Sequence, residues 1–129
     1  MSDSIPSELR YTKDHEWARA EGDVIVVGIT AHAVEQLGDI TMLSLPEVGA
    51  SVTAGEVFGD IDSVKATSDL FAPLDGAVTE VNGDLDAAPE KVNEDPYGNG
   101  WMIKIKPADK GAFDELLSAD AYAELVAAG

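Results

Sequence analysis

One short stretch constrains the fold more than any other: Gly59-Asp-Ile-Asp-Ser-Val-Lys-Ala-Thr-Ser-Asp-Leu-Phe71. From Val57, two residues before this stretch, side chains alternate between two unlike faces, one carrying Val57, Gly59 and Ile61 and the other carrying Phe58, Asp60 and Asp62. This period of two is typical of a β-strand. Downstream, Ser68–Phe71 leads into a turn signal at Pro73–Gly76. Small and polar residues separate the two runs, so the stretch predicts a β-hairpin that carries Lys65 at its exposed tip.

Lys65 is the only lysine or arginine between Arg19 and Lys91. A surface lysine in an acidic protein is ordinarily just a solvated charge. A carrier lysine, however, must be unhindered, accessible to a modifying enzyme and held on a rigid support, and a hairpin tip meets all three requirements. Acylation there would remove the positive charge and add an arm. We therefore hypothesise that Lys65 is a modified carrier lysine, whereas Lys104 and Lys106, on a predicted strand face, are poorer candidates.

The balance of charge and the absence of cysteine exclude several classes of function. The formal net charge is -17, from 25 Asp and Glu against 8 Lys and Arg. Binding a phosphate backbone requires clustered cations, and an anionic membrane surface attracts basic segments, so neither nucleic acid nor membrane is expected as a partner. The chain has no cysteine, which excludes disulfides, thiolate metal sites and cysteine nucleophiles.

Length and termini indicate the domain organisation. We expect a single domain over residues 1–129, with residues 1–10 as a loosely held N-terminal arm. The first residues lack both a basic region and an apolar run, so no secretory signal is predicted. No stretch approaches the length of a membrane span. The expected compartment is the cytoplasm.

Patterns elsewhere predict further short strands and helices. Four more strands are expected at Glu16–Ala20, Val24–Ile29, Ile40–Leu45 and Ala77–Val81, the second of them buried on both faces. A short helix is expected over Ala31–Leu37, with Thr30 as its N-cap and Gly38 just past its end. Residues 84–100 are expected to form an ordered loop, because they contain Pro89, Pro96, Gly98 and Gly100.

The last part of the chain combines one strand with helix. Trp101–Lys106 alternates apolar and basic residues, and its solvent-facing lysines followed by Pro107 predict a protected edge strand. Helical turns are expected over Ala112–Leu117, followed by Ser118 as the cap of a helix over Ala119–Val126, whose apolar stripe should pack on the sheet. The residues therefore predict a mainly β chain of short antiparallel strands with a short internal helix and C-terminal helices.

No self-contained catalytic or metal site is expected. His15 and His32 are the only histidines, and without cysteine or close spacing they do not predict a zinc site. Asp14-His15-Glu16 offers acid and base groups, yet no serine or threonine lies in a nucleophile elbow and no glycine loop could cradle a phosphate. Asn82–Asp86 superficially resembles a calcium loop but lacks the remaining ligand positions.

Several motifs in a fixed order give the chain a family resemblance. They are Tyr11-Thr-Lys-Asp-His-Glu-Trp17, Gly28-Ile-Thr-Ala-His-Ala33, Gln36-Leu-Gly-Asp39, Leu45-Pro-Glu-Val-Gly49, Asp62-Ser-Val-Lys-Ala-Thr-Ser-Asp69, Pro73, Gly76, Glu80-Val-Asn82, Val92-Asn-Glu-Asp-Pro-Tyr-Gly98 and Gly100-Trp-Met-Ile-Lys-Ile-Lys-Pro107. With this order and spacing, from about Tyr11 to Tyr122, the chain resembles the H proteins of the glycine cleavage system.

The resemblance implies a barrel-sandwich hybrid fold, related to lipoyl and biotinyl carrier domains, with lipoate linked to Lys65 by an amide. It implies a non-catalytic carrier that is expected to be a monomer. A pyridoxal-phosphate-dependent glycine decarboxylase would load an aminomethyl group on the lipoyl arm. A tetrahydrofolate-dependent aminomethyltransferase would then take the one-carbon unit, and a flavin-containing dihydrolipoyl dehydrogenase would reoxidise the dithiol. A lipoylating enzyme would attach the arm.

The resemblance also implies roles for four further residues. Asp62 is the departure from the family pattern, because the family usually has glutamate at this position, three residues before the lysine. If the lipoylating enzyme recognises this carboxylate, the shorter side chain affects the efficiency of lipoylation. Glu16, His32 and Asp69 are implied to line the cleft that shelters the loaded arm. Carboxylates suit this role because they can hold a protonated aminomethyl nitrogen by charge-assisted hydrogen bonds. The ordinary alternative for these three residues is surface polarity, and for Asp69 turn capping.

Three alternatives remain open. A lipoyl relay protein of the same fold would use Lys65 but pass its lipoate to other carriers. Biotin attachment is disfavoured, because biotinyl domains place methionine on both sides of the lysine and this chain has Val64 and Ala66. A hydrolytic enzyme that uses His15 or His32 lacks the nucleophile motif it would need.

Overall fold

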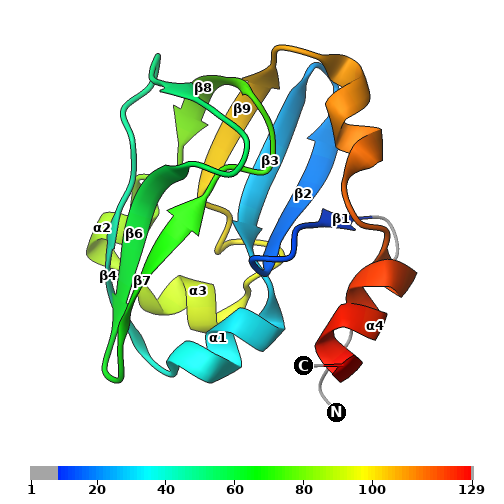
Figure 1. Cartoon of the computed structure of the whole chain (residues 1–129). Helices are drawn as coiled ribbons and strands as arrows, with labels where there is room; N and C mark the ends of the chain where they lie inside the picture. The colour runs from blue at the N-terminus through cyan, green and yellow to red at the C-terminus, as the bar shows by residue number, and fades with distance from the viewer. Residues whose placement is uncertain (1–8, 129) are drawn as a thin grey trace.

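The computed structural model describes residues 9–128, which form two antiparallel sheets with short helices around them (Figure 1). The strands are β1 (Arg10–Tyr11), β2 (Glu16–Glu21), β3 (Val24–Ile29), β4 (Ile40–Ser44), β5 (Ser51–Val52), β6 (Val57–Ser63), β7 (Thr67–Phe71), β8 (Gly76–Val81) and β9 (Ile103–Pro107). The helices are α1 (Ala31–Leu37), α2 (Asp84–Ala87), α3 (Glu90–Glu94), the 3-10 helix η1 (Lys110–Glu115) and α4 (Ala119–Ala128). None of the helices within residues 9–128 is long and apolar enough to cross a lipid bilayer.

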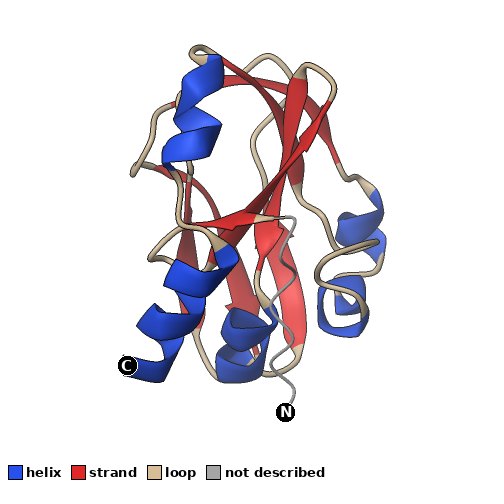
Figure 2. Ribbon diagram, turned by 90° about the vertical axis from the view of Figure 1, so that its right-hand side faces the viewer, coloured by secondary structure: helices blue, strands red, loops and turns tan. Residues whose placement is uncertain are grey.

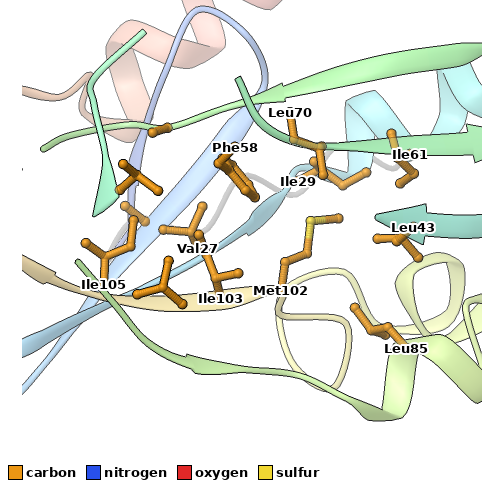
Figure 3. Packing of buried hydrophobic residues seen from close by; sticks show 14 of the residues in the cluster. Val27, Ile29, Leu43, Phe58, Ile61, Leu70, Leu85, Met102, Ile103 and Ile105 are labelled. Carbon is orange, nitrogen blue, oxygen red and sulfur yellow. The ribbon is translucent and has the colours of Figure 1, made fainter. Parts of the chain in front are cut away.

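One sheet has six strands in the order β1-β2-β3-β9-β8-β5, and the other has three in the order β4-β6-β7. Figure 2 shows the helices lying outside these strands. Apolar side chains from both sheets meet between them and form the main core (Figure 3). The labelled core residues are Val27, Ile29, Leu43, Phe58, Ile61, Leu70, Leu85, Met102, Ile103 and Ile105.

Strand β3 is buried on both faces, as its continuous apolar character predicts. One face contributes to the main core, and the other meets a second cluster that contains Trp17 and Tyr122. The Trp17 ring covers Gly28 so closely that a methyl group at Gly28 would lie 2.7 Å from it. Tyr122 stacks on Tyr11 with ring centroids 4.6 Å apart. The apolar stripe of the C-terminal helix therefore packs on the outside of the six-stranded sheet.

Both predicted ends of helix α1 are confirmed. The Thr30 side chain accepts a hydrogen bond from the Ala33 N–H at 3.3 Å. Gly38 follows the helix with a φ of 80°, and its N–H donates to the Val34 carbonyl at 2.9 Å. The chain then turns into β4, so the end of α1 comes to lie beside the tip of the β6–β7 hairpin (Figure 1).

The ordered loop expected over residues 84–100 is wrong in part, because α2 and α3 form within it. Leu85 and Val92 are buried and anchor the two short helices to the core. Asn82 holds the two ends of the connection together, since its amide donates to the Asn99 carbonyl at 3.0 Å and to the Trp101 carbonyl at 2.8 Å.

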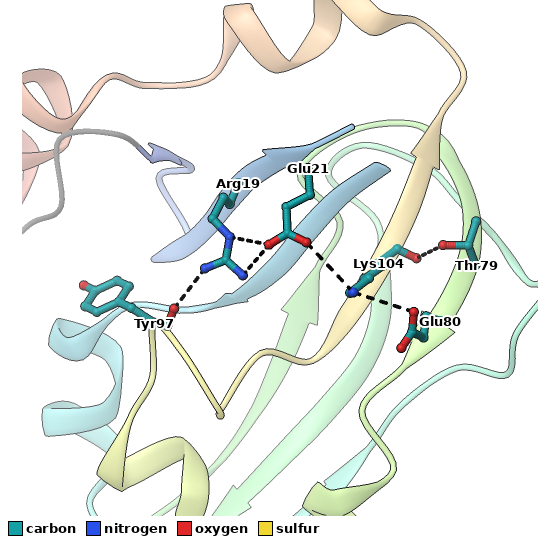
Figure 4. A network of polar contacts seen from close by, with 6 residues as sticks. All are labelled: Arg19, Glu21, Thr79, Glu80, Tyr97 and Lys104. Atoms are coloured by element: carbon teal, nitrogen blue, oxygen red, sulfur yellow. Dashed lines mark hydrogen bonds and ion pairs between the residues drawn. The ribbon is translucent and has the colours of Figure 1, made fainter. Parts of the chain in front are cut away.

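Strand β9 is not the edge strand that its lysines predict, because it lies between β3 and β8. Its isoleucines face the core, and Lys104 lies on the other face, with Nζ 3.6 Å from a Glu80 carboxylate oxygen and 4.0 Å from one of Glu21 (Figure 4). Glu21 also pairs with Arg19 at 2.8 Å. An antiparallel sheet with one solvated face accommodates lysines in a central strand as well as at an edge.

Two smaller expectations also differ from the structure. The helical turns expected over Ala112–Leu117 form as η1, a 3-10 helix over Lys110–Glu115. The N-terminal arm expected over residues 1–10 is too long, because Leu9 is buried and Arg10 begins β1. The rest of that arm, residues 1–8, lies outside the described residues.

Candidate functional site

The β6–β7 hairpin carries Lys65 at its exposed tip, as the sequence predicts (Figure 1). The Ser63 N–H donates to the Ala66 carbonyl at 2.8 Å, and the Ser63 hydroxyl oxygen accepts from the N–H groups of Lys65 at 3.2 Å and Ala66 at 3.1 Å. The Val64 N–H donates to the Asp39 carbonyl at 3.0 Å, which ties the tip to the segment after α1. Within residues 9–128 the Lys65 amine forms no ion pair. The tip is therefore a fixed turn that presents one accessible amine.

Glu16, at the start of β2, is only 1% exposed although it carries a carboxyl group. One of its oxygens accepts a hydrogen bond from the Thr12 hydroxyl at 3.0 Å, and the other accepts from the Phe71 N–H at 3.0 Å. Burial raises the pKa of Glu16 to about 8, opposed by these two hydrogen bonds and reinforced by the charge of Asp14. Phe71 ends β7, so Glu16 holds the far end of the strand that begins beside Lys65.

Two histidines face each other where β2 and α1 begin. The ring centroids of His15 and His32 are 4.7 Å apart. His15 Nδ1 shares a hydrogen bond of 2.8 Å with the Tyr122 hydroxyl, which lies 2.7 Å from Thr30 Oγ1. Burial, and then the charge of His32, lower the pKa of His15. Of these three residues, the family resemblance implies a cleft role only for His32. His15 and Tyr122 are 107 positions apart, and no local pattern indicates that they meet.

One description recurs among known proteins that are similar to this chain. The family model "Glycine cleavage H-protein" matches residues 9–128. The glycine cleavage system H protein of Rubrobacter xylanophilus is 57% identical over 119 residues, which cover 92% of this chain and 92% of that protein. The one from Bacteroides thetaiotaomicron is 54% identical over 123 residues, which cover 95% of this chain and 98% of that protein. A crystal structure of a glycine cleavage system H protein from Mycobacterium marinum matches with a TM-score of 0.87 and 44% identity, covering 95% of this chain and 99% of that one.

The chain belongs to the glycine cleavage H-protein family. As an H protein it is a non-catalytic carrier of aminomethyl groups on a lipoyl arm, and family membership implies a lipoyl-lysine prosthetic group. Membership also means that the chain works with the other proteins of the glycine cleavage system. The structural match confirms the barrel-sandwich hybrid fold that the resemblance implies.

The residues at the hairpin tip of this H protein fit a lipoyl group. Attachment requires a primary amine that an enzyme can reach, and Lys65 is exposed. Among its neighbours at the turn, Ser63 and Ala66 have small side chains and the Val64 side chain is exposed. The carbons of the lysine stem lie against Gly38, which has no side chain to obstruct them. The described residues around the tip therefore leave the amine accessible for amide formation.

The structure links the three predicted cleft residues through their neighbours. Glu16 and His32 have a common neighbour, because His15 precedes Glu16 in the chain and its ring faces that of His32. Asp69 lies on β7, two residues before the Phe71 N–H that Glu16 accepts. Asp69 is exposed, and its carboxylate forms no hydrogen bond or ion pair with the residues that the structure describes.

Asp62 belongs to the hairpin tip of the H protein and is not one of the predicted cleft residues. It faces Thr67 in the last residue pair that joins β6 to β7. Its carbonyl accepts a hydrogen bond from the Thr41 hydroxyl at 3.2 Å, and its side chain is half-buried. Its main chain is therefore held at the base of the turn that carries Lys65.

Proposed function

We propose that Lys65 is the residue that carries the lipoyl group, and that residues 1–129 act as one carrier domain. One observation carries the proposal: the exposed Lys65 amine stands on a turn that Ser63 closes by hydrogen bonds. Lys13 and Lys106 are exposed as well, but Lys13 lies in the loop before β2 and Lys106 lies within β9. A modifying enzyme can reach a lysine at a hairpin tip more easily than a lysine at either of these positions.

Loading the carrier is an acyl transfer to the lysine. The unprotonated Nζ attacks the carbonyl carbon of activated lipoate, the amide bond forms, the activating group leaves and the nitrogen gives up a proton. The positive charge of Lys65 is lost in this step. A bound lipoyl group supplies a dithiol that holds and releases an aminomethyl group. The contribution of the chain is to keep the amine exposed on a turn that does not need to reorganise.

We propose that the lipoylating enzyme recognises Asp62 as well as the lysine. It lies three positions before Lys65, and its main chain is held by Thr41 and by pairing with Thr67. A carboxylate at a fixed place beside the modified residue gives a partner a charged group to recognise. The side chain is one methylene shorter than the glutamate that the family resemblance implies, so a modest loss in lipoylation efficiency is expected.

The proposed cleft for the loaded arm is formed by Glu16, His32 and Asp69. Asp69 is already exposed and free to accept a hydrogen bond from a protonated amine. Glu16, with its pKa of about 8, is mostly protonated near neutral pH while no cation is beside it. A cationic nitrogen at this place would favour the carboxylate and release the proton, because an opposite charge lowers the pKa of a carboxyl group. Sheltering a loaded arm here would also keep water away from it.

The partners follow the order that the resemblance implies. Glycine decarboxylase with pyridoxal phosphate loads the carrier, the tetrahydrofolate-dependent aminomethyltransferase unloads it, and dihydrolipoyl dehydrogenase with its flavin restores the disulfide. We propose that a monomer visits each enzyme in turn. The net charge of -17 supports brief docking on basic faces, since long-range attraction raises association rates without requiring tight binding.

Intact mass and peptide mapping after co-expression with a lipoylating enzyme and lipoate test the attachment site. We expect a single lipoyl adduct at Lys65 in the wild type and in a Lys106→Arg control, and none in Lys65→Arg. An adduct at another lysine, or no adduct on folded wild-type protein, would refute the assignment. Aminomethyl acceptance from purified glycine decarboxylase then tests the carrier step, and failure by fully lipoylated protein would contradict that step alone.

A further inference from the structure

The aliphatic stem of Lys65 does not extend freely into solvent but lies across the backbone of Gly38. A methyl group built on Gly38 would be 3.1 Å from Lys65 Cε, 3.6 Å from Cδ and 3.7 Å from Cγ. Three successive carbons of the lysine therefore follow the surface of one glycine. This glycine ends α1 and precedes β4, 27 positions before the lysine in the printed sequence.

Asn93, from α3, holds this glycine and the residues after it in place. Its Nδ2 donates to the Gly38 carbonyl at 2.8 Å, and its Oδ1 accepts from the Ile40 N–H at 2.9 Å. Between these two residues, the Asp39 carbonyl accepts from the Val64 N–H at 3.0 Å. Three consecutive residues are thus fixed, two by one side chain and one by the hairpin tip itself. Hydrogen bonds therefore join the backbone on which the lysine stem packs to the turn that carries the lysine.

We propose that Gly38 and Asn93 are positioning residues that set the direction in which the Lys65 amine leaves the hairpin. The proposal rests on Lys65 as the lipoylated residue. A free lysine side chain has many rotamers, and an enzyme that acylates it must select one of them. Packing the stem on Gly38 limits those rotamers before the enzyme docks, which places the amine closer to its reactive position. Lipoylation is then faster for the same docking surface.

Two separate features favour glycine at position 38, namely its backbone conformation and its close contact with the lysine. Its φ of 80° and ψ of -150° fall in a region that is essentially restricted to glycine. Gly55 also has a φ of 80°, but a methyl group there would meet nothing within 4 Å. A Gly55→Ala variant therefore introduces strain at positive φ without touching the lysine, and it is the matched control for Gly38→Ala. Asn99, which is exposed, provides the matched control for Asn93.

The test is steady-state lipoylation of the four alanine variants by a lipoate ligase with lipoate and ATP, followed by mass spectrometry. We expect kcat to fall about three- to tenfold in Gly38→Ala and Asn93→Ala, the loss expected when a side chain must be ordered during the reaction. The KM for the carrier should stay near the wild-type value, because the docking surface is unchanged. Gly55→Ala and Asn99→Ala should keep the wild-type kcat. Thermal unfolding of each variant reports its folding separately.

Nuclear magnetic resonance of the unmodified protein gives a readout that does not depend on lipoylation. We expect nuclear Overhauser contacts between the Lys65 side-chain methylenes and the Gly38 α-protons in the wild type, and their loss in Asn93→Ala. If Gly38→Ala does not fold, the kcat of Asn93→Ala alone decides whether these residues affect the lipoylation rate. Wild-type kcat in folded Asn93→Ala, a change confined to KM, or absence of the contacts in the wild type would each overturn the proposal. Lack of any adduct at Lys65 would instead refute the attachment site, and the resonance data would still decide whether Gly38 orders the side chain.

Discussion

Replacing Glu16 by glutamine tests whether this carboxyl group is protonated in the folded protein. Glu16 is buried and accepts hydrogen bonds from the Thr12 hydroxyl and the Phe71 N–H. Glutamine has nearly the same shape. Its oxygen can accept from the Phe71 N–H, and its uncharged amide takes the place of the protonated carboxyl oxygen beside the Thr12 hydroxyl. The variant therefore resembles the neutral form of Glu16 at every pH.

The magnitude follows from the shift in pKa. Burial raises the pKa of Glu16 from its ordinary value of 4.5 to about 8. Between these values the folded state holds a proton that the unfolded state has released, so this contribution to stability is complete below 4.5 and is lost as the pH rises through 8. At about 1.36 kcal/mol per pKa unit, the wild type should lose about 3 kcal/mol of unfolding free energy between about pH 5.5 and about pH 9 from this group.

Urea unfolding at several pH values and constant ionic strength measures the effect. The stability of Glu16→Gln relative to the wild type should increase with pH over this range by about 3 kcal/mol and then level off above about pH 9. Glu47→Gln, at an exposed position, controls for the removal of one acid from a chain of net charge -17. A difference between Glu16→Gln and the wild type that does not change with pH would refute the reasoning.

Two further substitutions test the packing around the site. Tyr122→Phe removes the hydroxyl that joins the C-terminal helix to His15, and it should destabilise the fold by about 1–2 kcal/mol in urea unfolding, since each hydrogen bond contributes about 1 kcal/mol. An unchanged midpoint would mean that water replaces the hydroxyl. Gly28→Ala places a methyl group 2.7 Å from the Trp17 ring and should cost about 1–3 kcal/mol by overpacking, with a red shift of tryptophan fluorescence as the ring moves. Wild-type stability and fluorescence would contradict this packing.

Local patterns were sufficient where neighbours in the chain determine the structure. The hairpin around Lys65 and helix α1 with Thr30 and Gly38 at its ends each depend on short runs of residues. The position of β9 in its sheet does not depend on a short run of residues. Outward lysines fit an edge strand and a central strand with one solvated face equally well, and only pairing with β3 and β8 distinguishes them.

The connection over residues 84–100 shows a second limit. Its helices α2 and α3 span 4 and 5 residues. A segment this short completes little more than one turn, so it cannot display the 3.6-residue periodicity that identifies a helix. Pro89 and Gly98 meanwhile indicate a loop. Burial of Leu85 and Val92 stabilises both helices, and burial depends on the rest of the fold.

The candidate site also contains residues whose placement depends on local sequence and residues whose placement depends on the rest of the fold. The position of Lys65 at a hairpin tip could be predicted because the hairpin is local, whereas the burial of Glu16 could not. A carboxyl group at the start of a strand ordinarily faces water, and this one is buried because Phe71, 55 positions away, presents its N–H there. Asn93 belongs to the motif Val92–Gly98, but nothing in that motif indicates which backbone groups its side chain binds. Its two hydrogen bonds reach Gly38 and Ile40 only because α3 folds against the end of α1.

Strand β7 connects these two parts of the molecule physically. It is the outer strand of the three-stranded sheet, with Lys65 two positions before its first residue and Phe71 as its last. Glu16 supplies the hydrogen-bond acceptor that a neighbouring strand would otherwise provide for the Phe71 N–H. A cation beside Glu16 favours its carboxylate, and a carboxylate accepts a stronger hydrogen bond than a neutral acid does. A cation held near Glu16 would therefore strengthen the attachment of the same strand whose other end presents the lysine.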